Sequence, residues 1–289
     1  DPLWSRGLGD VYKRQIYMYI GNKLMNSYNE DMMLLKSTLT KAAEIAMHYF
    51  KKPVKHWMKT DKSPVSEADI KVNEYLEKTL LSQRPDYGWI SEESANNSLL
   101  NKKAINFIVD PIDGTRGFLV HDVYWCIGVA IEENNQITAS AIICPAIGEF
   151  YYGAKGCGAY FNGQPFTCIE HVKTNEESLV LGLPTKLLNN IKDKDLNNLT
   201  IYPYISSLLY KIILCARGII DVVVIYPSCK VWDIAAANLF LQYTKGILVD
   251  YNETNIVYSH LGEYEHYLFA CKNNSYYKTI SLEIENIIR

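Results

Sequence analysis

Two aspartates, Asp110 and Asp113, follow an apolar run at a spacing that could bind a cation. Pro111 fixes its own φ angle and Gly114 permits an unusual one, so the chain can turn sharply here. Both carboxylates and the Ile112 carbonyl can then point toward one place. Carboxylates held this close repel unless a cation neutralises them or one takes up a proton. We interpret the segment as a divalent-metal site, and its all-oxygen ligands favour Mg²⁺ or Mn²⁺ over zinc.

The same aspartates have two other interpretations. Asp is a common turn residue, so Asp110 and Asp113 could simply cap a turn. Aspartyl-phosphate phosphatases carry a DxDGT signature that also ends in Asp-Gly-Thr. One residue separates the aspartates there and two separate them here, which argues against that chemistry.

Further acidic residues stand at places where structure alone could also explain them. Glu92 and Glu93 follow a short apolar run, and Asp233 precedes an apolar helical pattern. The glutamates could be solvated loop charges, and Asp233 could be a helix N-cap. Asp69 stands three residues after Ser66 in capping-box form, which needs no catalytic role.

The spacing of apolar residues predicts the elements that position these acids. Three- and four-residue steps over 31–50 indicate an amphipathic helix that ends before Pro53. A second helix should start at Ser66 and end at Arg84. Short β-branched or aromatic runs then predict strands joined by hairpins, over 104–109, 124–132, 137–144 and 149–154.

The second half alternates strand and helix patterns, which indicates a layered α/β architecture. Strands are expected over 179–183, 221–225, 246–250 and 267–271, and helices over 207–216 and 233–243.

The chain divides into two predicted domains after a short leader. We expect residues 26–172 to form an N-terminal α+β domain with the metal site, and residues 173–289 a C-terminal α/β domain. Residues 1–25 are expected to be a non-native or disordered leader, because the chain begins without Met and the apolar run 16–20 is too short for a signal peptide.

Composition limits the classes of function. The 289 residues are 48% hydrophobic and 21% charged, which argues against general disorder. The formal charge of -3 argues against binding of long nucleic acid but leaves a small anionic ligand open. No apolar run approaches the roughly 18 residues of a membrane span. Seven dispersed cysteines without a CxxC pair are typical of reduced thiols and predict a cytoplasmic location.

Three motifs together resemble the inositol monophosphatase superfamily in their order and spacing. They are Glu-Glu-Ser at 92–94, Asp-Pro-Ile-Asp-Gly-Thr at 110–115 and Trp-Asp-Ile-Ala-Ala-Ala at 232–237. The likeness extends from about Met33 to the C-terminus. It implies a layered αβαβα sandwich and a Mg²⁺-dependent, usually lithium-sensitive phosphomonoesterase, and a homodimer is expected from it alone.

The resemblance also implies roles for individual residues. One metal ion would be surrounded by Glu92, Asp110, the Ile112 carbonyl and Thr115, and a second by Asp110, Asp113 and Asp233. Asp69 and Thr115 would orient and deprotonate the attacking water, and the N–H groups of Gly114 and Thr115 would hold the phosphate.

The substrate is predicted from a finer resemblance. Asp-Gly-Thr-Arg-Gly-Phe at 113–118 is similar to the Asp-Gly-Thr-Lys-Glu-Phe form of 3'(2'),5'-bisphosphate nucleotidases, and Ser-Leu-Leu-Tyr-Lys at 207–211 is similar to a segment of their bacterial members. Arg116 and Lys211 would suit a second phosphate, although both could be ordinary surface charges. The chain lacks the Gly-Ser pair that many relatives place before this helix.

Several functions therefore stay open. The leading prediction is hydrolysis of 3'-phosphoadenosine 5'-phosphate to AMP. Inositol-1-phosphate and histidinol phosphate are alternatives that use the same metal ligands. A non-catalytic metal- or phosphate-binding module is an alternative of another class, but the Asp69 and Thr115 pair argues against it.

Overall fold

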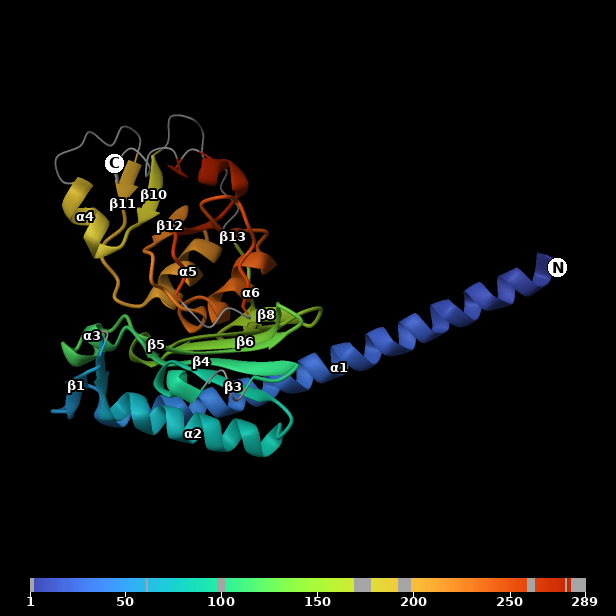
Figure 1. The fold of residues 1–289 in the computed structure, drawn as a ribbon, viewed down its shortest axis with the longest axis horizontal. Helices are drawn as coiled ribbons and strands as arrows, with labels where there is room; N and C mark the ends of the chain where they lie inside the picture. The colour runs from blue at the N-terminus through green and yellow to red at the C-terminus, as the bar shows by residue number, and fades with distance from the viewer. Residues whose placement is uncertain are drawn as a thin grey trace.

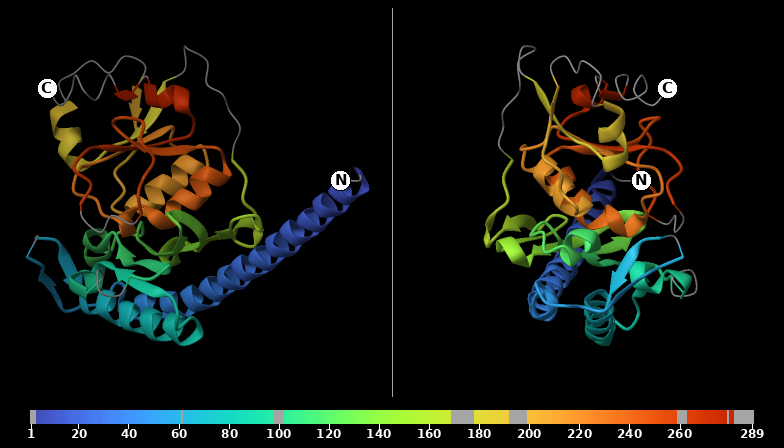
Figure 2. Two further views of the ribbon diagram at one scale, coloured as in Figure 1. Left: turned by 45° about the vertical axis from the view of Figure 1, so that its right-hand side comes forward. Right: turned by 90° about the vertical axis from the view of Figure 1, so that its left-hand side faces the viewer.

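The computed structural model describes residues 3–60, 62–97, 102–168, 178–191, 199–258, 263–278 and 280–281, and it arranges them in layers (Figures 1 and 2). One outer layer holds α1 (Leu3–Tyr49) and α2 (Glu67–Gln83). A seven-stranded sheet follows, then a middle layer of α5 (Leu208–Ala216) and α6 (Ala235–Tyr243). A five-stranded sheet covers that layer, with α4 (Thr185–Ile191) and helical residues 274–278 outside it. The predicted αβαβα sandwich is confirmed.

The seven-stranded sheet carries the strands predicted for the first half of the chain. In spatial order it contains β3 (Gly88–Ser91), β4 (Ile105–Asp113), β5 (Cys126–Glu133), β6 (Gln136–Cys144), β7 (Glu149–Ala154), β8 (Gly158–Phe161) and β9 (Gln164–Pro165). β3 runs parallel to β4, and the other neighbours are antiparallel. β4 continues past the predicted end at Val109, so the two aspartates lie on the strand itself.

The five-stranded sheet is mixed. In spatial order it contains β11 (Leu199–Ile201), β10 (Leu179–Gly182), β12 (Val222–Ile225), β14 (Leu268–Cys271) and β13 (Ile247–Asp250). β11 and β12 run parallel to β10, and β14 is antiparallel to both of its neighbours. The predicted domain boundary at 172/173 lies outside the described residues, so the division stays a prediction.

Smaller elements connect the layers. They are the β1 (His56–Met58) and β2 (Pro64–Ser66) ribbon, α3 (Thr115–Leu119), and the 3₁₀ helices η1 (Glu92–Asn97), η2 (Pro145–Ile147) and η3 (Val231–Asp233). Four of them, β2, α3, η1 and η3, contribute residues to the candidate site described below.

Buried apolar side chains separate the layers into distinct cores. The predicted stripe of α1, including Leu35, Leu39 and Ala42, packs with α2 against one face of the seven-stranded sheet. α5 and α6 fill the space between the two sheets, and Leu187 of α4 packs on the outer face of the smaller sheet. Because α5 lies between two sheets, each of its residues from Leu209 to Ala216 is buried.

The two outer helices end where the sequence predicts. α1 stops before Pro53, and α2 begins after Ser66 with the predicted capping box. The Ser66 N–H donates to Asp69 Oδ2 at 2.8 Å, while the Asp69 N–H donates to Ser66 Oγ at 3.4 Å. Upstream, α1 continues to Leu3 as one helix whose N-terminal part projects from the sheets (Figure 1). No break in the helix separates residues 3–25 from the rest of α1, so the leader remains a prediction.

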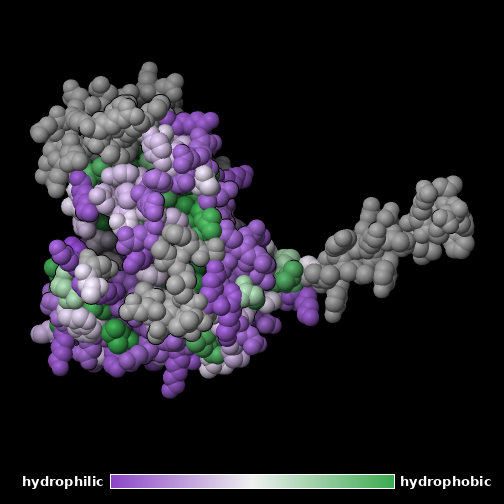
Figure 3. Space-filling model, in the orientation of Figure 1, coloured by the Kyte–Doolittle hydropathy of each residue, from purple (hydrophilic) through white to green (hydrophobic). Residues whose placement is uncertain are grey.

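The surface in view is mainly hydrophilic, with hydrophobic residues scattered over it (Figure 3). Among the described residues, no helix combines the length and apolar character needed to cross a membrane.

Candidate active site

A β-bulge places the two central aspartates. Asp110 pairs with Gly128 and Asp113 with Cys126, so the two β4 residues between the aspartates face a single residue of β5. One of them, Pro111, has no N–H to donate to the ladder, which favours a break in register there. A bulge changes the direction of neighbouring side chains. Here it lets Asp110 and Asp113 line the same cavity.

This cavity, of about 180 Å³, brings together most of the predicted site residues. Its lining includes Glu92, Asp110, Ile112, Asp113, Gly114, Thr115, Arg116 and Asp233. They come from η1, β4, α3 and η3, which are far apart in the sequence. Of the predicted residues, Asp69 reaches the site through Thr115, and Lys211 does not line the cavity.

Asp110 is a buried carboxylate for which the described residues supply no ion pair. It is 2% exposed, and its Oδ1 accepts no hydrogen bond within the described structure. Burial, followed by the negative charge of Glu92 and Asp113, holds the pKa of Asp110 well above its usual range. A buried charge without a partner is costly, and a cation would remove that cost. This orphaned oxygen fits a metal ligand better than a turn cap.

Asp113 is held by the start of α5. Its Oδ2 accepts hydrogen bonds from Ser207 Oγ at 2.5 Å and from the Leu209 N–H at 2.6 Å. Burial still raises the pKa of Asp113. These donors fix the orientation of the carboxylate, as partners behind a ligand do in metal sites.

Asp233 closes the acidic group from the other half of the chain. It stands at the end of η3, where its Oδ2 accepts the Lys230 N–H at 2.6 Å, and Ile234 rather than Asp233 is the N-cap of α6. Burial, followed by the charge of Glu92, raises the pKa of Asp233 to about 8. Because the N-cap of α6 is Ile234, the interpretation of Asp233 as the N-cap of that helix is wrong.

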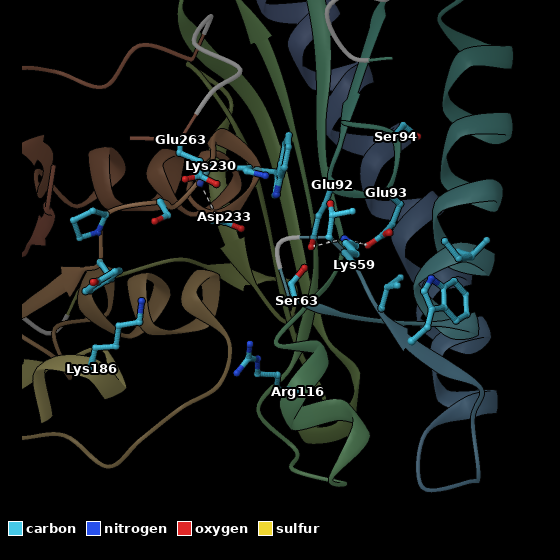
Figure 4. Close-up of a pocket in the computed structure, with 18 residues that line it drawn as sticks. Lys59, Ser63, Glu92, Glu93, Ser94, Arg116, Lys186, Lys230, Asp233 and Glu263 are labelled. Atoms are coloured by element: carbon cyan, nitrogen blue, oxygen red, sulfur yellow. Dashed lines mark hydrogen bonds and ion pairs between the residues drawn. The ribbon is translucent and has the colours of Figure 1, made fainter. Parts of the chain in front are cut away.

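Glu92 and Glu93 are ion-paired, not freely solvated. Lys59 Nζ lies 2.8 Å from an Oε1 of each glutamate (Figure 4). Burial and the charge of Glu92 raise the pKa of Glu93 to about 7. The sequence does not predict this role of Lys59, because no local motif shows that the segment joining β1 and β2 lies next to η1.

No group of three or more His, Cys, Asp or Glu side chains in the described ranges is arranged to hold a metal ion. Lys59 forms an ion pair with Glu92, and backbone N–H groups donate hydrogen bonds to the carboxylates of Asp113 and Asp233. Divalent cations would fit the all-oxygen donor set if Glu92 exchanged its lysine for the ion.

Thr115 connects the acidic group to Asp69. Its Oγ1 lies 2.9 Å from Asp69 Oδ1 and 2.9 Å from the Ile112 carbonyl oxygen. The other carboxylate oxygen of Asp69 accepts from Ser66 Oγ at 2.5 Å. Burial raises the pKa of Asp69 to about 6. Asp69 therefore serves as a capping residue and also contacts the candidate catalytic hydroxyl.

Gly114 has the unusual backbone angle that the sequence predicts. Its φ is +91°, and an added Cβ would lie 3.1 Å from both Ser206 Oγ and the Ser207 nitrogen. Only glycine fits this turn without strain. The turn directs the chain from β4 into α3 beside the carboxylates.

The two predicted cations differ in placement. Arg116 is exposed and lines the cavity, and its Nη2 donates to the Lys62 carbonyl at 3.3 Å. Lys211 is only 9% exposed on α5, and burial lowers its pKa. Because α5 lies between the two sheets, Lys211 is enclosed in the interior and does not line the cavity.

A larger cavity of about 830 Å³ adjoins the first and shares Ser63, Glu92, Arg116 and Asp233 with it. It adds cationic and aromatic side chains that the sequence did not predict: Lys59, Lys186, Lys230, Trp57, Tyr226 and Trp232. Lys186 and Lys230 come from the C-terminal half (Figure 4).

The fold and site define a layered α/β protein in which buried carboxylates lie beside a cavity that also has cationic side chains in its lining. The family model described as the inositol monophosphatase family matches residues 29–282. The chain therefore belongs to the inositol monophosphatase family, and it is a Mg²⁺-dependent phosphatase of that family.

Individual relatives are distant. An inositol monophosphatase of Dictyostelium discoideum is 27% identical over 198 residues, covering 64% of this chain and 71% of the relative. The 3'(2'),5'-bisphosphate nucleotidase CysQ of Aggregatibacter actinomycetemcomitans is 26% identical over 235 residues, covering 78% and 87%. A solved IMPase of Thermotoga maritima shares the fold with a TM-score of 0.76 at 20% identity, covering 91% of this chain and 98% of that one.

Without divalent cations, we expect the stability of the protein to fall as the pH rises from 6 to 8. The raised pKa values of Asp69, Glu93 and Asp233 mean that the folded chain binds more protons than the unfolded chain in this window. The free energy of unfolding then decreases with pH, because an unfolded carboxyl ionises near pH 4.

The measurement is the Tm across this window in EDTA and in MgCl₂. Mg²⁺ should flatten the dependence, because it stabilises the ionised carboxylates. A Tm in EDTA that stays constant or rises from pH 6 to 8 would contradict the prediction.

Proposed function

We propose that the chain hydrolyses a 3'(2'),5'-bisphosphate nucleotide, with 3'-phosphoadenosine 5'-phosphate as the preferred substrate. The observation that carries the proposal is the larger cavity, which joins the carboxylates to a wall with Arg116, Lys186 and aromatic rings. A volume of about 830 Å³ is in the range of small-molecule sites and leaves room for more than one phosphate. The CysQ relative is a nucleotidase of this class.

Two or more Mg²⁺ ions would complete the site, and Mn²⁺ would suit the same ligands. Their proposed ligands are Glu92, Asp110, the Ile112 carbonyl and Thr115 for one ion, and Asp110, Asp113 and Asp233 for another. Bound cations would neutralise charge on the phosphoryl oxygens and lower the pKa of water. The orphaned Oδ1 of Asp110 supports its place between the two ligand groups.

The residues of the chain then position and deprotonate the attacking water. Thr115 has a single hydroxyl hydrogen, and donating it to Asp69 Oδ1 leaves a lone pair that can accept from water. Asp69 would take up the proton as general base. The N–H groups of Gly114 and Thr115 would hold the phosphoryl oxygens. Water would then attack phosphorus in line, and this direct attack forms no covalent enzyme intermediate.

The other substrates use less of this cavity. Inositol-1-phosphate has no second anion for Arg116. Histidinol phosphate carries an amino group that the cationic wall would repel. A non-catalytic binder would have no use for the contact between Thr115 and Asp69.

Phosphate release from the three substrates in Mg²⁺ tests the proposal. We expect kcat/KM for 3'-phosphoadenosine 5'-phosphate to exceed that for the other two by about tenfold or more, since one added charge contact is worth roughly that factor. Li⁺ should slow the reaction. Preference for inositol-1-phosphate or histidinol phosphate would overturn the substrate, and metal binding without turnover would support the binding module.

Location and assembly are secondary proposals. No disulfide joins the cysteines in the described part of the chain, which is in keeping with a proposed cytoplasmic location. A homodimer is proposed from the family resemblance alone.

A further inference from the structure

Lys186 stands on a wall of the larger cavity. It is an exposed residue of the first turn of α4, and its Nζ lies 4.0 Å from the centre of the Tyr226 ring. Tyr226 lines the same cavity. A cation over an aromatic ring is attracted to it, which holds the ammonium at the cavity wall.

The charge of Lys186 is available to a ligand. Within the described part of the chain, neither Lys186 nor Arg116 forms an ion pair with a carboxylate, whereas Lys59 is neutralised by Glu92 and Glu93. Figure 4 shows Lys186 and Arg116 reaching the cavity from facing walls, away from Lys59. Two unneutralised cations that face one space favour an anion between them.

Lys230 is less suited to this role. It lines the cavity too, but its Nζ lies 5.4 Å from the Trp232 ring centre, next to the acidic group that includes Asp233. Lys211 is buried on α5 and does not line either cavity.

We infer that Lys186, together with Arg116, binds the anionic group of the substrate that is not hydrolysed, and so sets a preference for substrates with two phosphates. This inference rests on the proposed function. The reacting phosphate would lie at the carboxylates of η1, β4 and η3, while Lys186 comes from α4. The substrate would therefore span both halves of the chain. Lys186 takes the role that the sequence assigned to Lys211.

The test compares Lys186→Met and Lys186→Arg with wild type on 3'-phosphoadenosine 5'-phosphate and on inositol-1-phosphate, which has one phosphate. For Lys186→Met, the ratio of kcat/KM between the two substrates should fall about tenfold, mainly through a higher KM for the bisphosphate. Lys186→Arg should restore most of the ratio, because it keeps the charge. Lys78→Met, at an exposed position on α2, is the matched control and should keep the ratio.

The outcomes separate the two claims. If the wild type prefers the bisphosphate but Lys186→Met leaves the ratio of kcat/KM between the two substrates unchanged, the inference is overturned. The proposed function is then still supported. Equal losses on both substrates also overturn it, because they indicate a structural role. A wild type without preference for the second phosphate overturns both claims.

Discussion

Replacement of Asp110 by Asn should lower the rate of phosphate release by about 1,000-fold or more. Asp110 is the carboxylate that both proposed metal ions share, and its Oδ1 has no other partner in the described structure. Loss of several kcal/mol of transition-state stabilisation corresponds to a factor of this size. Steady-state assays with saturating Mg²⁺ measure the effect directly.

The same variant should behave differently in a stability measurement. In EDTA, Asp110→Asn should have a higher Tm than wild type, because a neutral amide replaces a buried carboxylate whose pKa is raised by burial and by neighbouring charges. Addition of Mg²⁺ should stabilise the wild type but not the variant. Asp86→Asn removes an exposed charge and should change neither activity nor Tm. Full activity in Asp110→Asn would contradict the assignment.

Replacement of Asp69 by Asn should lower kcat by about 100- to 10,000-fold, the range typical of a lost general base. Asn cannot accept a proton from Thr115, although it can keep a similar shape. The rate constant is the informative quantity, since Asp69 does not line either cavity and KM should change less.

Ser66→Ala is the matched control for Asp69. Asp69 accepts hydrogen bonds from the Ser66 backbone and side chain, so both variants weaken the start of α2. A lost cap costs about 1 kcal/mol of stability. If Asp69 only caps the helix, the two variants will lose similar stability and both will stay active. Loss of activity in Asp69→Asn alone separates catalysis from capping.

Features that depend on neighbouring residues could be predicted from the sequence. The capping box of Ser66 and Asp69 and the turn at Gly114 are local, because residue type restricts the backbone there. For Pro111 the sequence indicates only a sharp turn, and the structure forms a bulge there, because proline cannot donate a hydrogen bond to the ladder.

Features that depend on packing between distant segments could not be predicted. Lys211 belongs to a suggestive motif, but α5 is covered by two sheets and its lysine is buried. Lys59 and Lys186 have no local signal. They reach the site only because the β1–β2 ribbon and α4 come close to it in the folded chain.

Calorimetric titration with Mg²⁺ measures whether the buried carboxylates bind divalent cations, on which the proposed mechanism depends. Wild type and Asp110→Asn are compared without substrate near pH 7. We expect saturable binding to the wild type with release of protons, because carboxyl groups with raised pKa values must ionise to bind the ion. Asp110→Asn should lose that binding. Equal binding by both proteins, or no binding by the wild type, would show that these carboxylates are not a divalent-cation site.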